Sequence, residues 1–502
     1  MMTPRARPFR PLPPLSSWLA LSVLLGLGAC ASAPSSPASA SAPLPTQWFA
    51  TLPAQDSTAA LPQKPHQGTL TDLTRWWQQQ GDPLLVELIA AGQAVSPTVA
   101  SARSHIEQSR AARTTAGAAL LPSLEASASA SRARSQQAGG VDPAPVATTV
   151  QAGLQTAWEI DLFGGRRASR DAATDRLAGA QAQWHDARVS VAAEVANQYH
   201  SLRSCHQLEG VTRADATSRQ ETARLSRLST EAGFTAPATD ALARASAAEA
   251  SARATQQHAQ CDLDVKALVA LTGIAEPELR QKMAVTQPAP AQTAMISIAT
   301  VPASALAQRP DVFNAEREVA AASADMGSAE AQRYPRLTLG GAIGGARISA
   351  GGVSTDLSTW SIGPLALSLP LFDGGQRAAN VAAARARYDE AAALYRARVR
   401  QAVREVEEAL VKLQSTAERE SDSQTAAASY RASFVGTEAR FRSGLASLVE
   451  LEDARRTLLA SEITLVSLQR ERKAAWVALY RAMGGGWTPD LDRPFEAAAV
   501  RP

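Results

Sequence analysis

Two stretches of the chain follow one pattern and decide the fold: SPTV at residues 96–99 with LPSL at 121–124, and RPDV at 309–312 with YPRL at 334–337. The two prolines of the first stretch recur at one common offset in the second, so no insertion separates the copies. Further pairs follow in the same order: DLFGGR at 161–166 with LFDGGQ at 371–376, EV at 194–195 with EV at 405–406, and EAG at 231–233 with RSG at 442–444. Matched landmarks in one order predict two structurally equivalent halves. We place these halves at residues 71–290 and 291–490, followed by a C-terminal tail at 491–502.

The first 29 residues have the pattern of an export signal. Three arginines and no acidic residue precede a short apolar run at 18–27 and small residues at 28–29. This is typical of a signal peptide, here 1–29, rather than of a membrane-spanning helix. The letters LGAC at 27–30 resemble a bacterial lipobox, which implies cleavage before Cys30 and a lipid on that residue. An ordinary signal peptide with a chance cysteine is the alternative. Because Ala31 is not acidic, the resemblance favours the outer membrane.

Composition excludes some classes of function. The whole chain carries a formal charge of +3, and removing the three arginines of the signal leaves basic and acidic residues balanced. Charge therefore gives no reason to expect a nucleic-acid partner. Residues 30–70 are rich in Ser, Ala and Pro and predict an extended tether behind the lipid anchor. No later stretch reaches the roughly 18 consecutive apolar residues of a membrane-spanning helix.

Heptad spacing predicts long helices. Between residues 388 and 413, apolar residues recur every seven positions in two interleaved sets, as they do along a coiled-coil seam. No proline interrupts 166–232 or 376–447, and the first of these would make a helix about 100 Å long. Turns at Gly233 and Gly444 then reverse the chain. We therefore expect two helical hairpins, at about 166–272 and 376–483.

Two cysteines beyond Cys30 bear on the first hairpin. Cys205 and Cys261 lie equally far from Gly233 on either side, so they stand opposite one another in an antiparallel helix pair folded at that glycine. An exported protein can keep such a pair oxidised. The spacing predicts a disulfide between Cys205 and Cys261, with two unpaired buried thiols as the alternative.

Alternating residues predict four strands, in hairpins at about 122–162 and 335–372. Apolar and polar residues alternate along 124–131 and 150–161, and the second half repeats the pattern on either side of a glycine-rich stretch at 344–352. This is the apolar-out, polar-in pattern of a membrane β-barrel. Four strands cannot close a barrel, and an open edge is not tolerated in lipid. Several copies must therefore pool their strands, and three copies would give about twelve.

The chain resembles the outer membrane efflux proteins, the TolC-like family, and within it the lipoprotein branch (NodT-type) of tripartite multidrug efflux systems. The residues that carry this resemblance are WW at 76–77, GDPLL at 81–85, RPDV at 309–312, YPRL at 334–337, LFDGG at 371–375 and DARR at 453–456. The resemblance implies a homotrimeric channel with a mainly α fold, whose twelve-stranded β-barrel continues into a long periplasmic α-barrel. It also implies passive export of small molecules, powered by an inner-membrane pump of the RND type through a periplasmic adaptor protein.

The resemblance also implies roles for residues at the two hairpin turns. The tip residues Gly233, Thr235, Gly444, Leu445 and Ser447 would contact the adaptor. Leu448, Val449 and Asp453, just after the second turn, would narrow the periplasmic mouth as a gate.

Residue types give no support for an enzyme, a cofactor or a metal site. The six histidines are scattered without the spacing of metal ligands, and the paired glycines lack the phosphate-binding patterns. Two other functions remain open: a lipid-anchored coiled-coil scaffold without a pore, and an exit duct for secreted proteins. The scaffold does not need four amphipathic strands, and the lipobox favours small-molecule efflux over protein export.

Overall fold

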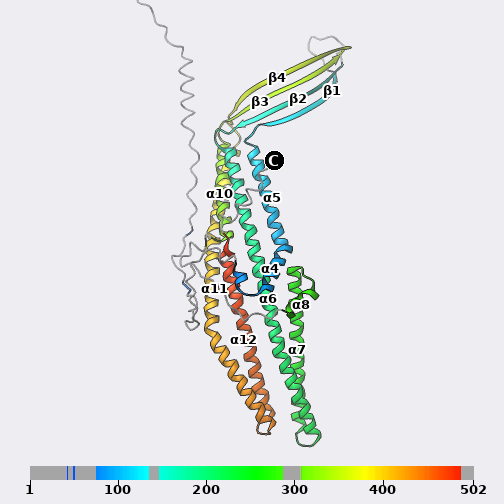
Figure 1. Cartoon of the computed structure of the whole chain (residues 1–502). Coiled ribbons are helices and arrows are strands. Elements are labelled where there is room, and N and C mark those ends of the chain that lie inside the picture. The colour runs from blue at the N-terminus through cyan, green and yellow to red at the C-terminus, as the bar shows by residue number, and fades with distance from the viewer. Residues whose placement is uncertain are drawn as a thin grey trace, which may run out of the picture. The chain divides into compact units, whose positions relative to one another are not determined.

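The computed structural model describes residues 42, 49–50, 75–134, 146–285, 306 and 308–487 (Figure 1). The signal peptide 1–29, Cys30, nearly all of the tether and the tail 491–502 lie outside the described residues. The described residues form two compact units. The sheet unit contains residues 110–175 and 319–392, and the helical unit contains the others. Each unit therefore draws on both sequence halves, so the repeats at 71–290 and 291–490 do not coincide with the compact units.

The two halves repeat one order of elements: a short helix, two strands, a long helix and a shorter helix. In the first half these are α5 (Pro97–Ala118), β1 (Ser123–Arg134), β2 (Val146–Ile160), α6 (Gly165–Glu231) and α7 (Pro237–Thr272). In the second half they are α10 (Pro310–Ala331), β3 (Arg336–Ala350), β4 (Val353–Ser368), α11 (Gln376–Arg442) and α12 (Leu448–Ala482). The helices α5 and α10 both have 22 residues, and α6 and α11 both have 67. The predicted repeats, hairpins and long helices are therefore present.

Four antiparallel strands form the sheet of the sheet unit, in the order β1-β2-β3-β4. The two hairpins join through β2 and β3, where Gly153 lies opposite Gly344. A Cβ atom on Gly153 would come within 2.9 Å of the Ile343 carbonyl oxygen, so the small residue allows the close approach of the two backbones. Strands β1 and β4 are the edges of the sheet.

Large apolar side chains of the strands are exposed. Trp360 and Ile362 of β4 are 75% and 85% exposed. Leu124, Val150, Leu154, Ile343, Leu365 and Leu367 are exposed as well. Contiguous exposed apolar surface is uncommon on a sheet that faces water and marks contact with lipid or with another chain. Within the described residues, no single helix is long and apolar enough to cross a membrane. Only α4 (Pro83–Val95) and α5 together, bent by 52° where they meet, reach that length and composition.

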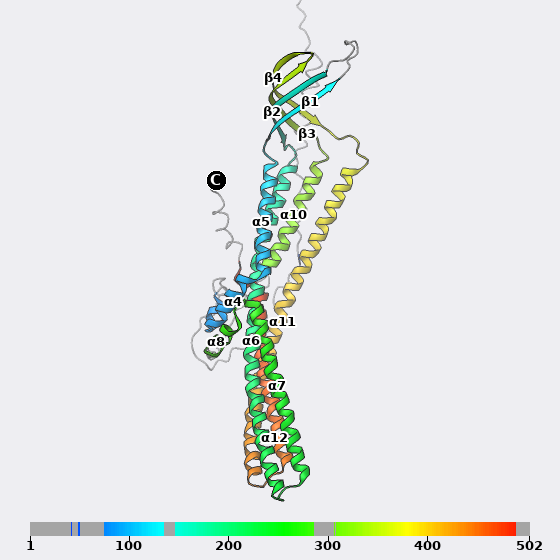
Figure 2. The ribbon, with the colours of Figure 1, turned by 90° about the vertical axis from the view of Figure 1, so that its right-hand side faces the viewer.

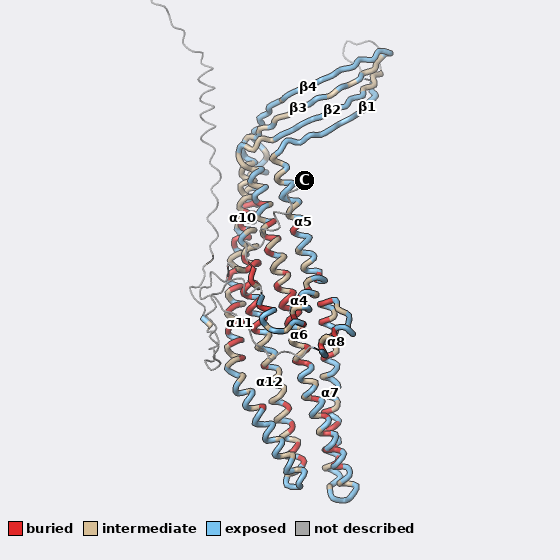
Figure 3. The backbone as a smooth tube through the Cα atoms, viewed as in Figure 1, coloured by how far each residue is buried: buried red, intermediate tan, exposed pale blue. Residues whose placement is uncertain are grey.

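Aromatic, branched and small apolar residues fill the core of the helical unit, where buried positions lie along the helices (Figure 3). The main cluster brings together residues of α4, α6, α7, α11, α12, α3 (Trp76–Gln79) and α8 (Glu276–Val285). The heptad seam of α11 is part of it: Val406, Ala409 and Leu413 are buried. A second cluster near the turns joins Ala223 of α6, Ala243 of α7 and Leu451 of α12. Figure 2 shows these three helices side by side where they approach the turns.

In the helical unit, the RPDV stretch at 309–312 forms the start of α10 and a buried set of ion pairs. Pro310 begins α10, and Arg309 before it is buried. The Arg309 guanidinium donates to the Ala482 carbonyl at 2.9 Å, to Asp311 at 2.8 Å and to Glu405 at 2.7 Å. Burial disfavours the Arg309 cation, but the two carboxylates outweigh it and raise its pKa. The pairing also lowers the pKa of Asp311 against the effect of burial. One arginine thus fastens the start of α10 to α11 and to the end of α12.

Gly484, in the short 3-10 turn at Gly484–Gly486 after α12, is the position where a side chain would be costly. It has φ +77°, and a Cβ atom there would lie 2.3 Å from the Gln308 carbonyl oxygen. We expect Gly484→Ala to destabilise the protein by about 2 kcal/mol or more, seen as a lower midpoint of thermal unfolding in detergent. Gly436→Ala is the control, because Gly436 lies within α11 with no atom within 4 Å of an added Cβ. An unchanged midpoint for Gly484→Ala would contradict this account.

Candidate functional site at the helix turns

The two turns that end α6 and α11 have the same backbone geometry. The Gly233 N–H donates to the Thr230 carbonyl, and the Phe234 N–H donates to the Ser229 carbonyl at 2.8 Å. At the second turn, Gly444 and Leu445 donate to the carbonyls of Phe441 and Arg440 in the same way. This is the Schellman motif, whose left-handed residue is a glycine at φ +81° in one turn and +74° in the other. The predicted equivalence of the two turns therefore extends to their hydrogen bonds.

An apolar side chain follows each of these glycines and is left in solvent. Phe234 is 86% exposed and Leu445 is 70% exposed. In a Schellman motif this residue often packs on a side chain of the last helical turn. Here Phe234 and Leu445 remain largely exposed, so neither is covered in this way. Both turns thus present an apolar side chain that nothing in the described chain covers.

The helices that leave the turns start differently. Ser447 caps α12: its hydroxyl accepts from the Glu450 N–H at 3.2 Å, and the Glu450 carboxylate accepts from the Ser447 N–H at 2.7 Å. Such a capping box satisfies two amide groups at the helix start. The start of α7 has no side-chain cap, although Pro237 occupies its first turn. Thr235 instead lies 2.5 Å from Ser229, hydroxyl to hydroxyl, across the first turn.

A disulfide joins the two helices of the first hairpin. Cys205 of α6 and Cys261 of α7 have their Cα atoms 5.5 Å apart, and their sulfurs are bonded. The bond fixes the register of α6 against α7 well away from the turn at Gly233.

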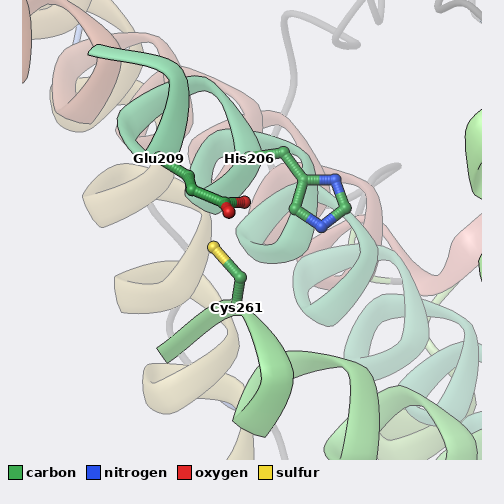
Figure 4. A group of neighbouring side chains, drawn as sticks. All are labelled: His206, Glu209 and Cys261. Carbon is green, nitrogen blue, oxygen red and sulfur yellow. The ribbon is translucent and has the colours of Figure 1, made fainter. Parts of the chain in front are cut away.

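One group of described side chains has the composition of a metal site but lacks a free thiolate. The ligand atoms of His206, Glu209 and Cys261 lie within 4.8 Å of one another (Figure 4). The sulfur of Cys261 is bonded to Cys205, and a metal would need the thiolate. The Glu209 carboxylate already contacts Arg213 and lies 2.8 Å from the His258 ring. With the disulfide formed, this group therefore holds no metal centre.

A buried ion-pair network connects the two hairpins near their turns. Glu452 of α12 is its centre: its carboxylate accepts from Arg219 of α6 and, at 2.6 Å, from the Ser246 hydroxyl of α7. The other oxygen of Glu452 accepts from Arg455 at 2.9 Å. Arg455 also donates to the hydroxyls of two α6 residues, Ser218 and Thr222, both at 2.8 Å. Burial lowers the pKa of Arg455, and the Glu452 carboxylate opposes that shift.

The three residues predicted for a gate lie in different surroundings. Leu448 is buried in the cluster that joins α6, α7 and α12. Val449 is 65% exposed. Asp453 pairs with Arg456 in solvent. Only Val449 and Asp453 therefore have side chains that another copy of the chain can contact.

Sequence reasoning missed the centre of the network by one residue. The sequence predicts a gate role for Asp453, whereas Glu452 beside it links the hairpins, since one step along a helix turns a side chain by about 100°. A signal was present: Arg455 continues the buried row that contains Leu448, Leu451 and Leu459 at helical spacing, and Glu452 directly follows Leu451. Charged residues within an apolar row are expected to have buried partners. The partner, Arg219, follows from the fold alone.

Comparisons with known proteins assign the family. The model of the outer membrane efflux protein family matches residues 88–274 and 301–485. The chain belongs to the outer membrane efflux protein family. It is 28% identical to the solvent efflux pump outer membrane protein SrpC of Pseudomonas putida, over 81% of this chain and 86% of that protein. It is 30% identical to the pyoverdine export outer membrane protein OpmQ of Pseudomonas putida, over 94% of this chain and 97% of that protein. Nodulation protein T of Rhizobium leguminosarum is also 28% identical.

Solved structures agree with this assignment. The outer membrane protein VceC of Vibrio cholerae matches with a TM-score of 0.70 and 26% identity, over 82% of this chain and 99% of that one. The CmeC outer membrane channel of Campylobacter jejuni matches with a TM-score of 0.76, over 85% and 90% of the two chains, and at 22% identity it supports the fold alone. This outer membrane efflux protein therefore has the fold of the family's channels.

Removing the charge of Glu452 tests the network. Glu452→Gln leaves the buried Arg455 and Arg219 without their shared carboxylate, which we expect to cost about 2 kcal/mol or more locally. Amide hydrogen exchange at 448–456 should become at least about tenfold faster. Asp453→Asn is the matched control, because Asp453 is 66% exposed at its side chain and Glu452 is 15% exposed. If amide hydrogen exchange at 448–456 is equally slow in the two variants, the network does not hold the hairpins together.

Proposed function

We propose that the chain is the outer membrane channel of a tripartite efflux pump of the RND type, through which drugs or other small molecules pass passively out of the periplasm. One observation carries the proposal beyond family membership: both helix turns present an exposed apolar residue on the same rigid backbone motif. A channel that depends on a pump for energy needs a docking surface of this kind. The names of relatives, which act on solvents and pyoverdine, support small molecules as cargo.

The working channel is a homotrimer in this proposal. Strands β1 and β4 are sheet edges, and unpaired backbone groups in lipid cost several kcal/mol each. Pairing β4 of one copy with β1 of the next removes every edge when the ring closes. Three copies would supply about twelve strands, within the size range of such barrels.

Electron-microscopic imaging of the detergent-extracted mature protein tests the trimer. We expect a hollow cylinder with three-fold symmetry, longer than the roughly 100 Å of one 67-residue helix. Solid rods or two-stranded fibres without a lumen would contradict the channel and leave the lipid-anchored scaffold as the better explanation.

An adaptor protein and an inner-membrane pump are the proposed partners. The contact surface on this chain would be the two turns. Phe234 and Leu445 would supply the apolar contacts. The predicted tip residues would belong to this surface: Gly233, Thr235, Gly444, Leu445 and Ser447. Apolar anchors surrounded by polar residues are typical of interface hot spots.

Replacing the exposed apolar residue of each turn by aspartate tests the docking surface. We expect Phe234→Asp with Leu445→Asp to weaken docking by about thirtyfold or more, because each change would bury an unpaired charge in an apolar contact. Export of a fluorescent dye such as ethidium by a strain carrying the variant should fall, while the amount of channel in the outer membrane stays the same. Leu263→Asp is the control, since Leu263 is similarly exposed but lies within α7, far along the chain from both turns. Undiminished export by the double variant would exclude the turns as the docking surface.

The periplasmic mouth is proposed to close at the second turn, with Val449 and Asp453 of each copy forming rings. Leu448 supports this ring from behind through its buried packing on α6 and α7. If Asp453→Ala leaves the single-channel conductance and its pH dependence unchanged, Asp453 has no part in the gate.

The anchor is proposed to be a lipid on Cys30. The apolar run and the LGAC letters support it. Incorporation of a palmitate analogue that persists in Cys30→Ser would contradict it.

A duct for secreted proteins is the second candidate. Its fold would be the same, so only the cargo separates the two. Deletion of the gene should raise sensitivity to toxic small molecules and leave the secreted proteins unchanged, and the reverse result would favour the duct. The exposed apolar strands make a scaffold without a pore the weaker candidate.

A further inference from the structure

A cavity of about 310 Å³ lies in the helical unit, among α3, the start of α4, α6 and α12. No part of the export function proposed above uses it. Its volume is at the lower end of the range for small-molecule sites. Four large aromatic residues line it: Trp76, Trp77, Tyr199 and Trp476.

The aromatic wall is rigid. Trp76 stacks on Tyr480 with ring centres 5.0 Å apart and meets Trp77 edge-on at 4.5 Å. All four aromatic residues of the wall are at least nine-tenths buried. Flat, fixed apolar surfaces of this kind bind the faces of planar rings without a large loss of side-chain entropy.

The one carboxylate of the wall is already satisfied. Asp82 accepts from the Tyr199 hydroxyl at 2.5 Å and from the Leu85 N–H at 3.2 Å. Arg203 donates to the same Tyr199 oxygen at 2.9 Å and lies over its ring. Burial and the neighbouring Asp82 raise the pKa of Tyr199, so its hydroxyl keeps the proton that it donates. Each oxygen of the Asp82 carboxylate therefore already accepts one hydrogen bond from the protein.

Several other polar groups of the wall are donors without an acceptor among the described residues. Lys473 makes no hydrogen bond or ion pair within the described residues. Burial lowers the pKa of its ammonium group, and the nearby charge of Asp82 opposes that shift. The side-chain nitrogens of Gln80 and Trp476 are buried and also have no partner in the described part of the chain. His200 beside them has an unpartnered Nδ1, and burial lowers its pKa to about 4, so the ring is neutral at pH 7. Buried donors are normally satisfied, so this excess indicates a missing acceptor.

We propose that this cavity binds a small organic anion with a flat aromatic body and a carboxylate. The carboxylate pairs with Lys473 and accepts from the free N–H groups of Gln80 and Trp476, while the ring lies against the tryptophan wall. A charge-assisted hydrogen bond in a partly buried site is stronger than a neutral one, so the charge of the ligand should decide its affinity. The site is separate from the residues of the proposed export function, because none of the turn, gate or strand residues lines the cavity.

Calorimetric titration of the full-length protein in detergent tests this proposal with three probes of one shape. We expect 2-naphthoate to bind saturably with one site per chain. Neutral 2-naphthamide should bind about tenfold more weakly or worse, and cationic 2-naphthylmethylamine should not compete. No saturable binding of 2-naphthoate, or equal binding of all three probes, would overturn the proposal without any mutation.

Variants then locate the site. Lys473→Met should weaken the binding of 2-naphthoate by about tenfold or more and leave the affinity for 2-naphthamide unchanged. Lys412→Met is the matched control, because Lys412 is an exposed lysine of α11 away from the cavity wall. Full affinity for 2-naphthoate in Lys473→Met would overturn the assignment. Because the charge series on the unmodified protein does not depend on any variant, a folding defect in Lys473→Met does not leave the question open.

Discussion

The unpaired edges of the four-stranded sheet are the constraint on which the rest of the architecture depends. Each chain of this outer membrane protein offers the free backbone of β1 on one side and of β4 on the other. In lipid no water can satisfy those groups, so the sheet is incomplete as a single copy. Because α6 begins five residues after β2 ends, and α11 eight residues after β4 ends, copies that share a sheet also bring the starts of their long helices together. The duplicated order of elements fits this arrangement, because each half of the chain supplies one hairpin of strands and one hairpin of helices.

Much of this could be predicted from the sequence because the decisive signals are local. Pro97 and Pro310 mark helix starts, since proline suits the first turn, and Gly233 and Gly444 mark ends, since each is left-handed. Strands followed from alternation along short runs. What could not be predicted depends on which segments meet: the pairing of β2 with β3, and the contact of Arg219 with Glu452. Arg219 is one of many charges on α6, and no local pattern distinguishes it.

The helical unit is held together differently along its length. Around Trp76 and Tyr199 the core is large, aromatic and apolar, and it joins seven helices. Near the turns it is reduced to a few residues such as Ala223 and Leu451, with charges at its centre. The partly buried carboxylate of Glu452, which pairs with two guanidinium groups, contributes less than well-packed apolar side chains of the same volume would, but it specifies one arrangement. Few apolar side chains pack at the turn-proximal ends of the hairpins, and the ion pairs there specify one register.

The duplication also bears on how a partner protein meets the chain. Both turns carry the same hydrogen bonds and an exposed apolar residue, but that residue is Phe234 in one and Leu445 in the other. Only the second turn leads into a capped helix, so its backbone is the better fixed of the two. Three copies in a ring would present six turns with the same backbone geometry, three of them exposing phenylalanine and three exposing leucine. A partner that contacts every turn must then either tolerate both side chains or use two different surfaces. Because the two side chains differ in size and ring character, the second arrangement gives the greater specificity between a channel and its adaptor.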